Sequence, residues 1–234
     1  MRTVIAIQAR LGSSRLPNKA LVDLGGKPLI VQLVRRLKTV KGVGMVVVAC
    51  PHKDEDAFRE VLGYQTIPGP EDDVLTRILN VANFLGAERI VKVGADCPLA
   101  PADAIEWALK TFPEERLIQN TVPRMHPDGF DFDIWHTEYL KDLDKRLKGD
   151  DREWFASWAM KHDGPGRYIP SNVNLSKWRL TVDYPEDVDL IRKIYEDMGS
   201  EVWDSRRIIE WCSTHPRDMK LNAHRVTDFG ARPL

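Results

Sequence analysis

Short hydrophobic runs alternate with amphipathic stretches through the first half of the chain. Runs rich in β-branched residues predict buried strands, and they lie at 3–8, 45–50 and 89–95. Apolar residues that recur every three or four positions predict helices, and such stretches lie at 28–40, 53–62, 72–85 and 102–112. Strands that alternate with helices of this length indicate an α/β domain whose mostly parallel sheet carries helices on both faces.

The pattern is less regular after residue 117. A strand is predicted at 129–135 from the alternation of Phe130, Phe132 and Ile134, and another at 177–183. Further helices are predicted at 136–148, 151–162, 185–198 and 205–213, with a stretch rich in Pro, Gly and Asn at 164–174. We expect one domain over residues 1–234, in which 120–176 forms a lid or a dimerisation arm.

Composition narrows the class of protein. The chain has 234 residues, of which 43% are hydrophobic and 29% charged, so a core can form without disulfide or metal support. The formal net charge of −1 gives no overall field toward nucleic acid or anionic membranes. No apolar run approaches the roughly 20 residues of a membrane span. Three scattered cysteines favour a reducing compartment, and we expect a cytoplasmic protein.

A basic loop follows the first predicted strand. Residues 9–19 carry Arg10, Arg15 and Lys19 and no acidic residue. In open α/β sheets the ligand edge lies at the carboxyl ends of the strands, and small residues such as Gly12 and Ser13 bring backbone N–H groups close to an anion. The loop matches neither the P-loop nor the dinucleotide fingerprint. A solvated basic turn is the alternative, but its position favours a polyphosphate site.

Two predicted strands end in an aspartate on a polar face. Asp96 follows Lys92 and Gly94 at the two-residue period, and Asp183 follows Arg179 and Thr181 in the same way. If both strands belong to one parallel sheet, the two carboxylates share its carboxyl edge with the basic loop. Magnesium is held by one or two carboxylates, so this pair predicts a Mg²⁺ site. Helix capping is the alternative for Asp183, and Asp187 is interpreted as an acid at a helix N-terminus.

Six segments resemble the cytidylyltransferase family that includes CMP-Kdo synthetase, and within it the spore coat polysaccharide biosynthesis protein F group. They are IQARLGSSRLPNKAL at 7–21, GKPLI at 26–30, PEDDVLTRIL at 70–79, KVGADCPL at 92–99, PDGFDFDIW at 127–135 and RLTVDYPEDVDLI at 179–191. They keep the order of the family along most of the chain.

The resemblance implies a GT-A-like three-layer sandwich with a mixed, mostly parallel sheet. It implies transfer of CMP from CTP to a sugar acid or related sugar, with Mg²⁺, pyrophosphate release and a homodimer, in polysaccharide biosynthesis. Catalytic roles fall to Arg10, Arg15, Lys19, Asp96 and Asp183, the last two as metal ligands. Substrate-binding roles fall to Ala9, Gly12, Ser13, Asp73, Arg77, Arg124, His126, Gly129 and Asp131.

Several positions depart from the family pattern. Lys92 and Gly94 stand where Arg and Thr are usual, Asp133 stands where Glu is common, and Trp154 replaces a His. These changes concern the acceptor more than the chemistry. The alternatives are a glycosyltransferase that uses a nucleotide-sugar, a nucleotidyltransferase that acts on a sugar 1-phosphate or phosphonate, and a non-catalytic nucleotide-binding module.

Overall fold

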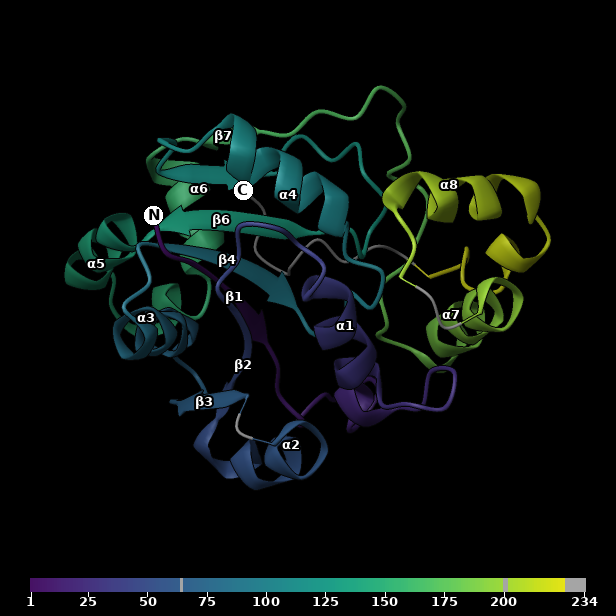
Figure 1. Ribbon diagram of the computed structural model, residues 1–234, viewed down its shortest axis with the longest axis horizontal. Coiled ribbons are helices and arrows are strands. Elements are labelled where there is room, and N and C mark those ends of the chain that lie inside the picture. The colour runs from purple at the N-terminus through teal and green to yellow at the C-terminus, as the bar shows by residue number, and fades with distance from the viewer. Residues whose placement is uncertain (64, 200–201, 226–234) are drawn as a thin grey trace.

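A central sheet organises the molecule (Figure 1). The computed structural model describes residues 1–63, 65–199 and 202–225. Within these residues the strand order is β3-β2-β1-β4-β6-β5-β7. Strands β3, β2, β1 and β4 are parallel, β6 is antiparallel to both β4 and β5, and β7 is parallel to β5. The strands are β1 Thr3–Gln8, β2 Met45–Pro51, β3 Thr66–Gly69, β4 Arg89–Gly94, β5 Leu117–Gln119, β6 Phe132–His136 and β7 Arg167–Tyr168.

Helices cover both faces of the sheet and give three layers. One apolar core joins the sheet to α1, α2 and α4, and a second joins its other face to α3, α5 and α6. Figure 1 shows α1 and α4 in front of the sheet, with α3 and α5 to its left. The helices are α1 Leu29–Leu37, α2 Glu55–Leu62, α3 Val74–Leu85, α4 Ala102–Thr111, α5 Thr137–Arg146, α6 Phe155–His162, α7 Pro185–Met198 and α8 Ser205–Thr214. The predicted α/β fold with a mixed, mostly parallel sheet is confirmed.

Strand β1 explains why the sheet is buried on both sides. Ile5 and Ile7 belong to the first core, whereas Val4 and Ala6 belong to the second, as the two-residue period requires. Each of these four side chains is completely buried. A central parallel strand between two helical layers is apolar throughout, so β1 delivers the loop that follows it to a fixed position at the sheet edge.

A third core lies beside the sheet. It packs α7 and α8 against Leu180, Val182 and Phe130, and in Figure 1 the two helices lie together at the right of the molecule. Pro185 occupies the first turn of α7, where its missing N–H costs nothing. This core fixes the segment that carries Asp183 to the carboxyl end of the sheet. No helix among the described residues combines the length and the apolar character needed to cross a bilayer.

The strand predicted at 177–183 is wrong. The segment pairs with the loop before β6 through an isolated bridge between Arg179 and Asp128, and Val182 N–H donates to Asp96 O at 2.8 Å. Its apolar side chains face the third core instead of a helical layer over the sheet. Alternating polarity therefore correctly indicated an extended segment with one buried side. A strand within a sheet and an extended segment outside it both show this pattern.

Three strands were not predicted, β3, β5 and β7, and all are short. The strand expected from residue 129 starts at Phe132. Within the segment 120–176, β6 lies inside the sheet and α6 contributes Phe155 to the second core. These parts belong to the central architecture. A role of the segment in closing the site or in a dimer stays a prediction.

Candidate active site

A cavity of about 1080 Å³ lies where the loops after β1 and β4 meet the segment around Asp183. Many of the residues assigned from the sequence line it: Ala9, Arg10, Gly12, Ser13, Arg15, Lys19, Arg77, Asp96, Arg124, Asp131 and Asp183. Asp73, His126 and Gly129 are not among the lining residues. Residues from near the N-terminus, from the middle of the chain and from the segment before α7 therefore share one cavity.

Lys19 joins the two aspartates. Its Nζ donates to Asp96 Oδ2 at 3.0 Å and to Asp183 Oδ1 at 2.8 Å. Burial lowers the pKa of Lys19, but the two carboxylates outweigh it and raise the pKa above its usual value, so the ammonium stays charged. Burial alone would raise the pKa of Asp96, and Lys19 holds it below the ordinary range. The two carboxylates are thus close enough to share one cation.

Asp183 is held by three cationic side chains. Besides Lys19, Arg15 Nη2 lies 2.9 Å from Oδ1, and Arg179 Nη2 donates to Oδ2 at 3.0 Å. Arg179 is 3% exposed and also donates to both oxygens of Asp187, which is completely buried. Asp187 in turn accepts from the backbone N–H groups of Asp183 and Tyr184. Asp187 therefore orients the site from the start of α7 and lies outside the cavity lining.

The loop after β1 has a fixed shape. Leu11 N–H donates to Asp54 Oδ2 at 2.9 Å, and Asn18 N–H donates to Leu11 O at 3.1 Å. Ser13 N–H donates back to Leu11 O. Within the described residues, the N–H groups of Gly12 and Ser14 have no hydrogen-bond acceptor, and both residues line the cavity. The loop therefore presents two free backbone donors together with its cations, which suits an anion.

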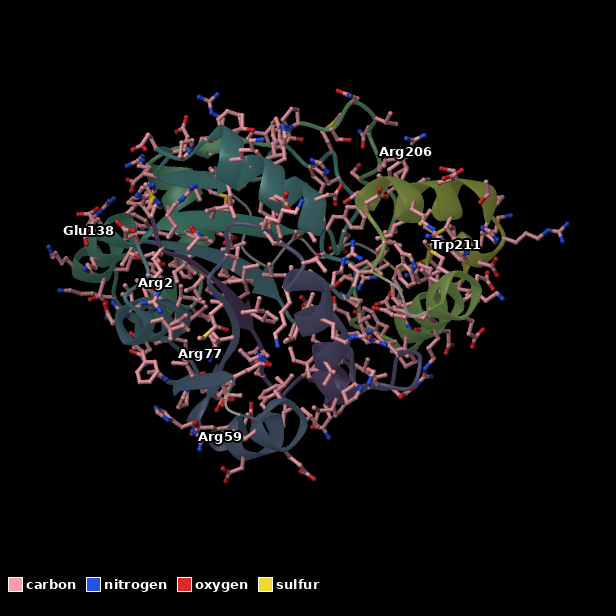
Figure 2. The ribbon with its side chains drawn as sticks, viewed as in Figure 1. Arg2, Arg59, Arg77, Glu138, Arg206 and Trp211 are labelled. Atoms are coloured by element: carbon pink, nitrogen blue, oxygen red, sulfur yellow. The ribbon has the colours of Figure 1, made fainter. Side chains whose placement is uncertain are left out.

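Arg10 and Arg77 complete the basic side of the cavity. Arg10 Nη1 lies 3.6 Å from Glu153 Oε1, a residue just before α6. Arg77 lies within the body of the molecule near β3, unlike Glu138 and Arg206 at the periphery (Figure 2). Its side chain is buried and donates to Pro70 O and Glu71 O. Arg77 thus fixes the loop before α3 from the cavity wall.

Negative charge dominates the part of the cavity formed by residues 124–133. Arg124 forms a two-pronged pair with Asp131, and Lys92 Nζ donates to Asp133 Oδ2 at 2.9 Å. Asp128 adds a third carboxylate to the wall. Burial raises the pKa of Asp131 in spite of Arg124. With three acids and two cations, this side is less suited to a polyphosphate than the loop after β1.

Three assigned residues have positions outside the cavity lining. Asp73 caps α3 by accepting from Thr76 N–H at 2.8 Å and pairs with Arg152. His126 Nε2 lies 2.9 Å from Ile169 O, so as a donor it ties its loop to the residue after β7. Gly129 has φ +97° and packs on the backbone at Leu180. The contacts of these three residues are therefore structural ones, within or between the loops that carry them.

Sequence reasoning did not single out some residues of the cavity. Asp128 was included only as part of the family-like segment at 127–135 and received no role of its own. Trp154 was noted as a departure from a family pattern and Glu153 was not assigned a role, yet both line the cavity. Burial and the neighbouring Asp96 raise the pKa of the Cys97 thiol well above its usual value. Cys97 is therefore a neutral thiol and a poor nucleophile.

Lys19→Met tests the shared cation. The substitution leaves two carboxylates facing each other, and breaking a buried ion pair costs about 3 kcal/mol. We expect a lower Tm at pH 8 without nucleotide or divalent metal. With Lys19 present, the depressed pKa of Asp96 gives stability above pH 4 that is lost as the pH falls. The gap in Tm between the two proteins should therefore shrink as the pH falls below about 4.

Lys53→Met provides the matched control for this measurement. Lys53 also pairs with a carboxylate, Glu71 at 2.6 Å, but on an exposed surface outside the cavity lining. Exposed pairs contribute little to stability. The Tm of this variant should therefore equal that of the native protein both at pH 8 and at the lower pH. Equal losses in the two variants would mean that Lys19 is an ordinary surface cation.

The chain was compared with known proteins. The family model described as Cytidylyltransferase matches residues 4–126. A 3-deoxy-manno-octulosonate cytidylyltransferase of Chloroherpeton thalassium is 36% identical over 49% of this chain and 47% of its own length. The spore coat polysaccharide biosynthesis protein SpsF of Bacillus subtilis is 25% identical over 82% of this chain and 86% of its own.

A solved cytidylyltransferase structure has a similar fold. A cytidylyltransferase from Leptospira borgpetersenii superposes with a TM-score of 0.87 over 97% of this chain and 99% of its own, at 24% sequence identity. This likeness concerns the fold. The family match covers more than half of the chain and contains the loop after β1, Arg77 and Asp96. The chain belongs to the cytidylyltransferase family.

Proposed function

We propose that this protein transfers CMP from CTP to a hydroxyl group of a sugar acid or related sugar and releases pyrophosphate, with Mg²⁺ as the cofactor. The observation that carries the proposal is the meeting of the loop after β1 with Asp96 and Asp183 through Lys19. The names of the relatives supply the base and the class of acceptor. SpsF in particular is named for polysaccharide biosynthesis, which is the pathway class we propose.

The triphosphate would lie along the loop after β1. Arg10, Arg15 and Lys19 supply positive charge, and the free N–H groups of Gly12 and Ser14 supply neutral donors. Nucleotidyl transfer depends mainly on positioning and on neutralising charge. In this arrangement the basic side chains hold the β- and γ-phosphates and stabilise the charge that develops on departing pyrophosphate.

Asp96 and Asp183 fit a magnesium ion in their donor chemistry. They offer hard carboxylate oxygens, and the ammonium of Lys19 already bridges them. Among the described residues there is no group of three or more His, Cys, Asp or Glu side chains that could hold a metal. Magnesium often uses one or two carboxylates and completes its shell with phosphate and water. When bound, it would neutralise charge at the α-phosphate.

The acceptor would lie against residues 124–133. Lys92, Asp131 and Asp133 line this side and present both donors and acceptors, as sugar hydroxyls require. Their ion pairs limit side-chain freedom, which favours a fixed orientation of the acceptor. The homodimer and the cytoplasmic location expected from the sequence stay predictions.

A pyrophosphate-release assay tests this function. ATP, CTP, GTP and UTP are each combined with Mg²⁺ and a panel of sugar acids, neutral sugars, sugar 1-phosphates and phosphonates. We expect release with CTP and a sugar or sugar acid, and none without acceptor. Release only with a sugar 1-phosphate or phosphonate would reassign the acceptor. Failure to release pyrophosphate with every pair would contradict the proposed reaction, and a glycosyltransferase would instead consume a nucleotide-sugar.

Nucleotide choice gives a prediction that needs no acceptor. In Mg²⁺, CTP should raise the Tm more than ATP, GTP or UTP at equal concentration. A ligand at 100 times its Kd stabilises by about 2.7 kcal/mol, which is about 5–10 °C for a chain of this size. Thermal unfolding followed by fluorescence provides the measurement. Equal shifts with the four nucleotides would remove the assignment of cytidine.

A further inference from the structure

Asp128 lies in the cavity wall and has no role in the assignments made so far. Its side chain is 14% exposed, and its residue precedes Gly129 in the loop before β6. The loop is clamped to the segment that leads to Asp183. Asp128 N–H donates to Trp178 O at 2.9 Å, and Leu180 N–H donates to Asp128 O at 2.7 Å. The backbone therefore holds Asp128 in one place.

The guanidinium of Arg179 contacts both Asp128 and Asp183. Arg179 Nη1 donates to Asp128 Oδ2 at 3.0 Å, and its Nη2 donates to Asp183 Oδ2 at 3.0 Å. Because Asp183 also contacts Lys19, Asp128 lies next to the group that we assign to the reaction centre. Rigid support of this kind is what a catalytic side chain needs.

One oxygen of Asp128 remains available. Within the described residues, the hydrogen bond from Arg179 is the only one to this carboxylate, and it uses Oδ2. Burial and then the charge of Asp131 raise the pKa of Asp128 to about 7, against Arg124 and Arg179, which lower it. The charged and titratable groups around it are Lys92, Asp96, Cys97, Arg124, Asp131, Arg179 and Asp183. A carboxyl group that titrates near neutrality suits proton transfer at physiological pH.

We propose that Asp128 is the general base of the reaction. Its Oδ1 takes the proton of the acceptor hydroxyl as the hydroxyl oxygen forms a bond to the α-phosphorus. The bond between the α-phosphorus and the bridging oxygen breaks, and pyrophosphate leaves with the electron pair. Asp128 later passes the proton to water. This inference rests on the proposed function and narrows it, because phosphate and phosphonate oxygens are already ionised and need no base.

Asp128→Asn tests the role, since the amide oxygen can still accept from Arg179. The assay uses CTP, Mg²⁺ and the acceptor that releases pyrophosphate fastest in the panel above. General-base catalysis contributes about 10²–10⁴-fold, so kcat should fall at least a hundredfold with little change in KM for CTP. In the native protein kcat should rise with pH up to about 7 and then level. The variant should lose this rise, and Asp128→Glu should recover part of the rate.

A second measurement needs no acceptor. A carboxyl whose pKa is raised in the folded state gives stability that is present below about pH 4 and lost as the pH rises through about 7. Relative to the native protein, Asp128→Asn should therefore gain in Tm between pH 5 and pH 8. A purely structural role predicts the reverse, a lower Tm at every pH, because the charged bond to Arg179 is weakened.

Asp142→Asn is the matched control. Asp142 also pairs with an arginine, Arg146 at 2.8 Å, but on the surface of α5 outside the cavity lining. It should leave kcat and its pH dependence unchanged. Near-native kcat in Asp128→Asn with a hydroxyl acceptor, or equal pH profiles, would overturn the general base and leave the proposed function intact. Absence of turnover in the native protein with every pair would instead end the proposed function, and this inference with it.

Discussion

Asp183→Asn is expected to remove magnesium-dependent turnover and leave the protein folded. The carboxylate receives Lys19, Arg15 and Arg179 within 3.0 Å, so its charge balances three cations at the reaction centre. An amide has the same shape but no charge, and its NH₂ group would face donors. Loss of a preorganised electrostatic contact costs about 3 kcal/mol or more, so turnover should fall at least about a hundredfold.

The fold should survive because the backbone at this position is held independently of the side chain. Asp183 N–H donates to Asp187 Oδ2, and Val182 N–H donates to Asp96 O. Pyrophosphate release in Mg²⁺ and the Tm are measured on the same sample. Asp189→Asn, on the exposed face of α7, is the control and should match the native protein in both. Near-native turnover in Asp183→Asn would remove the metal assignment.

The convergence of Asp96 and Asp183 was predicted for a reason that is only half right. Asp96 follows a strand of the sheet, as its period-two polar face indicates. Asp183 follows no strand and arrives through the third core, with Val182 N–H bonded to Asp96 O. The local pattern of polar and apolar residues identifies an extended segment that has one polar side. It does not specify whether the partner of that segment is a sheet or a loop.

The features that sequence reasoning missed depend on contacts between distant segments. Strand β5 has three residues and β7 has two, too few for a periodic signal. Asp128 acquires its properties from Arg179 and Asp131, through burial and charge that no local pattern contains. By contrast, Arg10, Arg15 and Lys19 were found because one continuous loop carries them after a strongly apolar strand.

Gly129→Ala is expected to damage both stability and turnover. Gly129 has φ +97°, and an added Cβ would lie 2.5 Å from Thr181 N and 2.6 Å from Leu180 O. The two backbones would have to separate, which would weaken the hydrogen bond from Leu180 N–H to Asp128 O. Overpacking and the unfavourable φ together cost about 3 kcal/mol or more, which is roughly 6–12 °C in Tm.

Gly164→Ala separates the two causes of that loss. Gly164 has φ +93°, close to the φ of Gly129, but an added Cβ meets no atom within 4 Å. It should therefore show the conformational cost alone, about 1–2 kcal/mol, with normal pyrophosphate release. The excess loss of Tm in Gly129→Ala then measures the packing of the two segments. Similar Tm values and similar turnover in the two variants would mean that this contact does not position Asp128 or Asp183, because the segments could then separate without consequence for the cavity between them.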